Sequence, residues 1–133
     1  MGTLIDTSVL IAAERGRIDP AQFADEDEDE PIAIAAISAA ELLHGVHRLT
    51  SAVARTRAER WVEHILAQLP CIAFDLPIAR VQARLGAELA EKGSQVGAHD
   101  LLIAATAVWL DYRIATRDVR SFPKIRGLNV VKW

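Results

Sequence analysis

Four carboxylates lie where an acidic side chain has no packing role, and together they have the chemistry to bind a divalent metal ion. Asp6 directly follows an apolar run that ends at Ile5, and Asp118 closes another short run in the same way. Glu41 and Asp100 lie near the start of longer apolar stretches. An ion that activates water or steadies a phosphodiester transition state takes oxygens from several separate elements, because neighbouring residues cannot surround it. Four acids on four segments meet that requirement.

Short apolar runs alternate with longer amphipathic segments, and this pattern predicts strands that alternate with helices. Such alternation is typical of a three-layer α/β/α domain with a central, mainly parallel sheet, here of about five strands. The ligand crevice of a parallel sheet lies beyond the carboxyl ends of its strands, so Asp6 and Asp118 would share one cleft. The predicted strands are 3–5, 32–36, 71–74, 113–116 and 128–131, and the predicted helices are 8–14, 38–50, 51–69, 77–93 and 98–110.

Helix capping offers a structural explanation for two of the acids. Asp6 could cap the helix that follows it, although Thr7 and Ser8 can do so without help, and Ser8 is the expected N-cap. Glu41 follows Ser38 by three residues, which is the spacing of a capping box. Taken singly, Glu41 is explained by capping as well as by chemistry.

The other two acids also have structural explanations. Asp100 opens an apolar helix and could complement its dipole, with His99 as a loop or cap residue. Asp118 could be an ordinary turn residue. Taken together, the four acids favour a metal-binding site over these structural explanations, because all four would converge on one edge of the sheet. Converging carboxylates raise one another's pKa values and a divalent cation relieves the repulsion, so metal is expected to stabilise the fold.

Size and composition fit a single domain that spans residues 1–133, and 51% hydrophobic residues allow a substantial core. The one cysteine, Cys71, cannot form an internal disulfide, and its apolar neighbours predict a buried thiol in a reducing compartment. The sequence shows neither a secretory N-terminal segment nor an apolar stretch long enough for a bilayer. We therefore expect a cytoplasmic protein that does not associate with membranes.

Charge is unevenly distributed along the chain. The net charge is −3, but the run Asp25–Glu30 holds six acids and is interpreted as a solvated loop. The rest of the chain is basic on balance, which makes a polyanionic substrate compatible with it. The side chains expected to contact such a substrate are Arg15, Arg48, Arg117 and Arg120.

Other catalytic chemistries lack their motifs. The histidines at 44, 47 and 64 show no zinc-ligand spacing and are interpreted as surface or helix residues. Neither a G-x-S-x-G elbow nor a G-x-x-x-x-G-K-[ST] loop is present, which disfavours triad hydrolases and nucleotide-loop enzymes. The tryptophans are expected to be core or interface residues: Trp61, Trp109 and Trp133.

The four motifs around the acids, taken in order, closely resemble those of the PIN-domain nucleases and, within them, the VapC toxins of bacterial toxin–antitoxin pairs. The match covers essentially the whole chain and is carried by Leu4–Ser8, Ile37–Leu42, Ala98–Ala105 and Ala115–Phe122. The resemblance implies a PIN-like fold and an endoribonuclease that uses Mg²⁺, with Mn²⁺ as a substitute, to hydrolyse RNA. It also implies a cognate VapB-type antitoxin whose tail occupies the groove near the acids, a homodimer, and a larger complex with the antitoxin.

The resemblance also implies roles for the acids. Asp6 and Asp100 would be the direct metal ligands, and Glu41 and Asp118 would complete the catalytic cluster and orient water. The mechanism that we expect is metal-assisted, in-line hydrolysis of an RNA phosphodiester, with the cation neutralising charge on the phosphate.

Two hydroxyl side chains are expected beside the acids, and the last motif differs from the family pattern at one position. Thr116 matches a hydroxyl that relatives often have beside the acids, and Thr7 is expected to support them. In relatives an Asn often stands at the position of Asp118, or an acid precedes the Phe, where this chain has Ser121. This departure leaves the role of Asp118 less determined than those of the other three acids.

Two alternatives remain. A receiver-like, Mg²⁺-binding signalling domain would need paired acids near the first strand and a Lys after a late strand, whereas this chain has Asp6 alone and Arg117 after Thr116. A catalytically silent PIN-type module would bind RNA or a partner without cutting.

Overall fold

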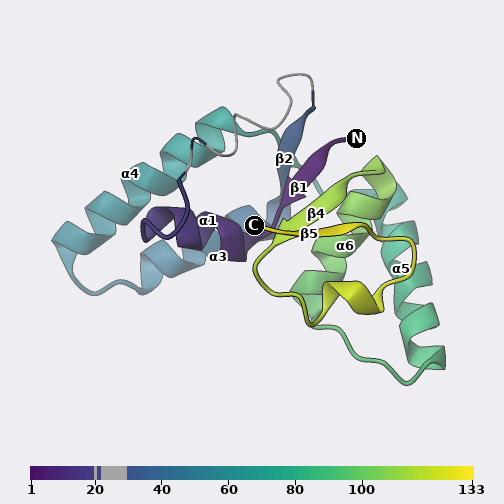
Figure 1. Cartoon of the computed structure of the whole chain (residues 1–133). Coiled ribbons are helices and arrows are strands. Elements are labelled where there is room, and N and C mark those ends of the chain that lie inside the picture. Colours follow the sequence, from purple (N-terminus) through teal and green to yellow (C-terminus); the bar gives the residue numbers. More distant parts are fainter. Residues whose placement is uncertain (20, 22–29) are drawn as a thin grey trace.

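The computed structural model describes residues 1–19, 21 and 30–133 (Figure 1). These residues form a five-stranded, wholly parallel sheet in the order β3-β2-β1-β4-β5, which confirms the predicted α/β architecture. The acidic run Asp25–Glu30 lies outside the described residues except for Glu30. The strands are β1 (Thr3–Ile5), β2 (Ile32–Ala35), β3 (Cys71–Ile72), β4 (Arg113–Thr116) and β5 (Val130–Lys132). The helices are α1 (Thr7–Glu14), α3 (Ala36–Arg48), α4 (Ala52–Gln68), α5 (Leu76–Glu91) and α6 (Ala98–Leu110), with a short 3₁₀ helix, η1 (Phe122–Lys124).

Helices cover both faces of the sheet, so the sheet is the middle of three layers (Figure 1). Helices α1, α3 and α4 lie on one side, and α5 and α6 lie on the other. Successive strand residues point to opposite faces, and the core divides accordingly. Leu4 and Ala33 pack with Ile103 of α6, whereas Ile5 and Ile34 pack in the cluster under α1, α3 and α4.

Helices α4 and α5 begin and end close to where the sequence predicts. The Ser51 hydroxyl accepts the backbone N–H of Ala54 at 3.3 Å at the start of α4. At the start of α5, Asp75 accepts the N–H of Ile78 at 3.2 Å, and Pro77 lies in the first turn. Local capping signals therefore determine these two boundaries.

Helices α1 and α3 begin earlier than predicted, and neither Asp6 nor Glu41 caps a helix through its side chain. Asp6 occupies the N-cap position of α1, yet its side chain makes no capping hydrogen bond. Helix α3 begins at Ala36, directly after β2, so Ser38 lies inside the first turn, where no described residue forms a hydrogen bond with its buried hydroxyl. The predicted capping box of Ser38 and Glu41 is wrong, because strand β2 passes into the helix without an intervening loop.

The edges of the sheet differ in detail from the prediction. Strand β3 is shorter than the predicted 71–74, and Cys71 on this edge strand is exposed, so the prediction of a buried thiol is wrong. Only β2 pairs with β3 among the described strands, which leaves its outer side uncovered. In the described part of the chain, every helix is too short or too polar to cross a membrane.

Candidate active site

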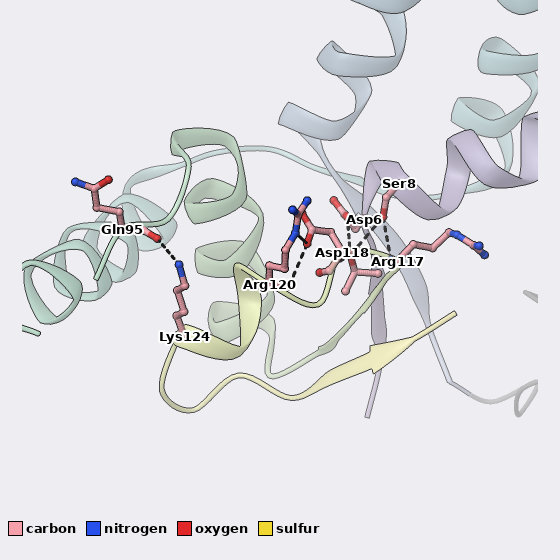
Figure 2. Close-up of polar contacts among 8 residues, drawn as sticks. Asp6, Ser8, Gln95, Arg117, Asp118, Arg120 and Lys124 are labelled. Carbon is pink, nitrogen blue, oxygen red and sulfur yellow. Dashed lines mark hydrogen bonds and ion pairs between the residues drawn. The ribbon is translucent and has the colours of Figure 1, made fainter. Parts of the chain in front are cut away.

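Asp6 lies at the end of β1, the central strand of the sheet, and is only 6% exposed. Its Oδ2 accepts hydrogen bonds from Ser8 Oγ at 2.7 Å and from Thr116 Oγ1 at 2.8 Å (Figure 2). The sequence predicts that Ser8 caps α1, but the structure shows that the Ser8 hydroxyl donates to the Asp6 carboxylate instead. Thr116, the last residue of β4, lies directly against Asp6, where the resemblance placed a supporting hydroxyl.

Glu41 projects from the second turn of α3, and its buried Oε1 has no hydrogen-bond partner among the described residues. Burial is the main cause that raises the pKa of Glu41, and the negative charges of Asp6 and Asp100 raise it further. His99 Nδ1 lies 3.5 Å from Oε1 and opposes this rise when it is protonated. The hydroxyl of Thr7 also favours the charged form, although its Oγ1 does not meet hydrogen-bonding geometry with any partner.

Asp100 lies in the first turn of α6, close to the end of β1. Burial is again the largest cause that raises its pKa, followed by the charge of Asp6. Asp118 adds to the rise, whereas the Ser121 side chain stabilises the charged form of Asp100 and lowers the pKa. These mutual effects show that acids from separate parts of the chain share one electrostatic environment.

Asp118 follows β4 and is held by the turn that comes after it. Its Oδ1 accepts the backbone N–H of Arg120 at 3.0 Å and the guanidinium Nε of the same residue at 3.3 Å (Figure 2). The backbone hydrogen bond is the main cause that lowers the pKa of Asp118. The charged form of Asp118 is thus favoured, in contrast to Glu41 and Asp100, whose pKa values are raised.

The donor chemistry of this cluster fits a small divalent cation. Carboxylate oxygens are the ligands that Mg²⁺ and Mn²⁺ prefer, and the buried Oε1 of Glu41 lacks a hydrogen-bond partner. Within the described residues, no three His, Cys, Asp or Glu side chains form a group that could hold a metal ion by themselves. An ion that takes one or two carboxylates directly and reaches the others through water is compatible with this open arrangement.

We expect Glu41→Gln to stabilise the metal-free protein at neutral pH. Because the pKa of Glu41 is raised in the folded state, its ionisation disfavours folding above that pKa, and the penalty disappears below 4.5, where the group is protonated in both states. The melting temperature of the variant should exceed that of the wild type by about 2 °C at pH 7, and the difference should close at acid pH. Thermal melts in chelator across this pH range, with the exposed Glu63→Gln as control, measure it. A difference that is constant with pH would contradict the electrostatic explanation.

Several residues near the acids were not predicted as part of the site. Ser8 and His99 were interpreted as capping residues, and Ser121 as a departure from the family pattern, yet all three act on the acids. The contact of Ser8 with Asp6 is local, whereas His99 acts on Glu41 and Ser121 acts on Asp100 across separate segments, so no local signal could have found Ser121. The histidines at 44, 47 and 64 are exposed, as predicted, and so are the four arginines expected to contact a polyanion. Trp61 and Trp133 pack against the α1, α3 and α4 core, whereas Trp109 is about half exposed.

A pocket adjoins the site between α1, α3 and α4. Glu41 lines one margin, and the rest of its lining is mostly apolar and includes Leu42, Gly45 and Val46 of α3. Ile11, Glu14 and Arg15 line the pocket on the side of α1, and Ala58 and Val62 line it on the side of α4. An apolar segment of a partner could therefore reach the acids along this surface.

The chain is similar to known proteins over almost its whole length. Residues 3–128 match the family model of the PIN domain. The chain is 33% identical over 131 residues to ribonuclease VapC1 of Rickettsia felis, which covers 98% of this chain and 96% of that protein. It is 30% identical over 100 residues to the tRNA(fMet)-specific endonuclease VapC of Salmonella typhimurium, which covers 75% and 74%. It matches the crystal structure of DNA-bound VapBC from Salmonella typhimurium with a TM-score of 0.89 and 25% identity, over 100% of this chain and 98% of that chain.

The sheet topology argues against the receiver-like alternative. Receiver domains have the flavodoxin-like strand order 2-1-3-4-5, whereas β1 here lies between β2 and β4. The family match leads to the same conclusion independently, because it spans the four motifs that hold the acids. The chain therefore belongs to the PIN-domain family and, within it, to the VapC ribonucleases.

Proposed function

We propose that this protein is the toxin of a type II toxin–antitoxin pair, a metal-dependent endoribonuclease that hydrolyses RNA phosphodiester bonds and is neutralised by a VapB-type antitoxin. The observation that carries the proposal is the electrostatic coupling of Asp6, Glu41 and Asp100, which come from three separate elements and meet at the carboxyl edge of the sheet. The names of the relatives, ribonucleases and a tRNA-specific endonuclease, support RNA as the substrate. Residues 1–133 would act as one PIN domain in the cytoplasm.

Each acid has a role in this proposal. Asp6 and Asp100 hold the cation, with Mg²⁺ as the expected ion and Mn²⁺ as a substitute. Glu41 and Asp118 complete the acidic cluster and orient water. A bound cation would supply positive charge at the scissile phosphate and favour ionisation of water, because no side chain of the cluster is an obvious general base.

Supporting residues position these groups or attract the RNA. Thr116 fixes the carboxylate of Asp6 through its 2.8 Å hydrogen bond, and Thr7 favours the charged form of Glu41. Arg117 and Arg120 are exposed beside Asp118 and give the edge of the site positive charge, which attracts the phosphate backbone.

The expected partners are an antitoxin and a second copy of the chain. Solved relatives are described as VapBC complexes, and the mostly apolar pocket between α1, α3 and α4 offers a place where an antitoxin segment would dock beside Glu41. A homodimer that joins the antitoxin in a larger complex is the assembly that we expect.

Incubation of the purified protein, freed of any partner, with total cellular RNA tests the function. We expect discrete 5′ ends in Mg²⁺ or Mn²⁺, read by sequencing, and their loss when excess chelator is added. Cleavage that persists in chelator would contradict the metal-dependent mechanism. Binding of RNA without cleavage in either metal would instead favour a catalytically silent PIN module.

A further inference from the structure

The two carboxylate oxygens of Asp6 have different surroundings. Oδ2 accepts two short hydrogen bonds, from Ser8 Oγ at 2.7 Å and from Thr116 Oγ1 at 2.8 Å. In the described part of the chain, no hydrogen bond reaches Oδ1. The asymmetry joins two distant parts of the sequence, because Ser8 lies two residues after Asp6 in the first turn of α1 and Thr116 lies at the end of β4.

Backbone amides set the direction in which both hydroxyls donate. The N–H of Arg117 donates to Ser8 Oγ at 3.0 Å, and the N–H of Asp118 donates to Thr116 Oγ1 at 3.0 Å. An amide N–H can only donate, so each hydroxyl accepts from the backbone and keeps its own proton to give. Thr116 Oγ1 also lies 3.2 Å from the backbone carbonyl oxygen of Asp118, but Asp6 Oδ2 is the nearer acceptor at 2.8 Å, so both hydroxyl protons point to Asp6. The two oxygens of Ser8 and Thr116 also lie 3.3 Å apart, but with both protons directed to Asp6 neither donates to the other.

We propose that Ser8 is a positioning residue that, together with Thr116, occupies Oδ2 of Asp6 and leaves Oδ1 as the single oxygen offered to a divalent cation. The proposal rests on the metal-dependent function above. Hydrogen bonds to a ligating carboxylate fix its orientation and are part of what determines metal affinity. Here they also determine how many oxygens the carboxylate can supply.

A carboxylate limited to one oxygen discriminates between cations. Mg²⁺ and its substitute Mn²⁺ suit six-coordinate sites with single-oxygen carboxylates, whereas Ca²⁺ takes up to eight oxygens at longer distances and accepts both oxygens of a carboxylate. Removing the Ser8 hydroxyl frees one position on Oδ2 and loosens the carboxylate. The expected consequence is a loss of preference for Mn²⁺ over Ca²⁺, in addition to weaker Mn²⁺ binding.

Calorimetric titrations of Mn²⁺ and of Ca²⁺ into the full chain, without RNA, test this inference. Ser8→Ala should weaken Mn²⁺ binding about tenfold and lower the ratio of Mn²⁺ to Ca²⁺ affinity, and Ser8→Thr, which keeps the hydroxyl, should restore the ratio. Ser38→Ala is the matched control, since this serine also lies in the first turn of a helix but its hydroxyl has no hydrogen-bond partner in the part of the chain that the structure describes. Its two affinities should equal those of the wild type.

Each remaining outcome would count against the inference. An unchanged Mn²⁺ affinity in Ser8→Ala, or an equal loss for both ions that Ser8→Thr does not restore, would reduce Ser8 to a structural residue while leaving the metal-dependent function in place. Wild-type protein that binds neither ion would overturn this inference and the metal site together. If Ser8→Ala does not fold, Ser8→Cys provides the test, because a thiol is a much weaker hydrogen-bond donor than a hydroxyl.

Discussion

Replacement of Asp100 by asparagine is expected to abolish RNA cleavage and to leave the fold intact. The amide has nearly the shape of the carboxylate but carries no charge, so it is a poor ligand for a hard cation. Loss of a ligand weakens the hold on the cation that would stabilise negative charge at the reacting phosphate, and this should lower the cleavage rate at least about 100-fold. The metal-free variant should be at least as stable as the wild type, because burial and the charges of Asp6 and Asp118 disfavour the ionised Asp100. Initial rates on a cleaved RNA fragment and melts in chelator measure both effects.

The same helix offers a matched control for this substitution. Asp111 ends α6 in the left-handed conformation, with φ of 56°, and is exposed. Asparagine adopts that conformation readily, so Asp111→Asn makes the same chemical change far from the cluster. Its cleavage rate should stay within about twofold of the wild type. Comparable rates for Asp100→Asn and Asp111→Asn would show that Asp100 is not part of the catalytic site.

Replacement of Gly45 by glutamine is expected to separate inhibition from catalysis. Gly45 lines the pocket between α1, α3 and α4, and a Cβ atom added at this helical position meets no described atom within 4 Å. The longer side chain should therefore fit the fold and improve the helix, while it fills space that a docked antitoxin segment would occupy. We expect antitoxin affinity to fall about 30-fold, or 2 kcal/mol, and metal-dependent cleavage to persist. Binding of the co-expressed VapB-type partner to each variant, and RNA cleavage in its presence, measure the two effects.

Gly45→Ala separates steric blockage from helix stabilisation. Alanine favours the helix over glycine by about 0.5–1 kcal/mol but adds a single methyl group to the pocket. It should therefore raise stability and leave antitoxin affinity close to that of the wild type. If Gly45→Gln binds the antitoxin as tightly as the wild type does, the antitoxin docks outside this pocket. If Gly45→Gln loses cleavage, the pocket contributes to RNA binding.

Helix boundaries could be predicted where the signals that set them are local. Ser51 and Pro77 mark the starts of α4 and α5, and helix α6 matches the predicted range 98–110. The starts of α1 and α3 could not be predicted in this way, because each helix follows a buried strand with at most one intervening residue. There the sheet aligns the backbone for the helix, and the serine at the expected cap position, Ser38 in α3, is left inside the first turn.

Burial, like the starts of α1 and α3, could not be predicted from local sequence alone, and Cys71 is an example. An apolar neighbourhood in the sequence indicates a strand but not its place in the sheet. Because β3 lies at the edge, Cys71 is exposed, whereas Ile34, its partner in register on β2, is fully buried. Strand order depends on packing over the whole chain, so it cannot be predicted from the residues of one strand alone.

The identities of the four acids and their positions at strand ends and helix starts are readable from the chain alone, because a carboxylate beside an apolar run stands out locally. The folded structure determines the burial and the contacts of each acid. Asp6 meets Thr116 across 110 residues, Glu41 is left with a buried oxygen, and Asp118 is held by Arg120. Such differences arise from burial and from contacts between distant segments, which determine charge, orientation and available oxygens, and therefore only the packed structure distinguishes one acid of this cluster from another.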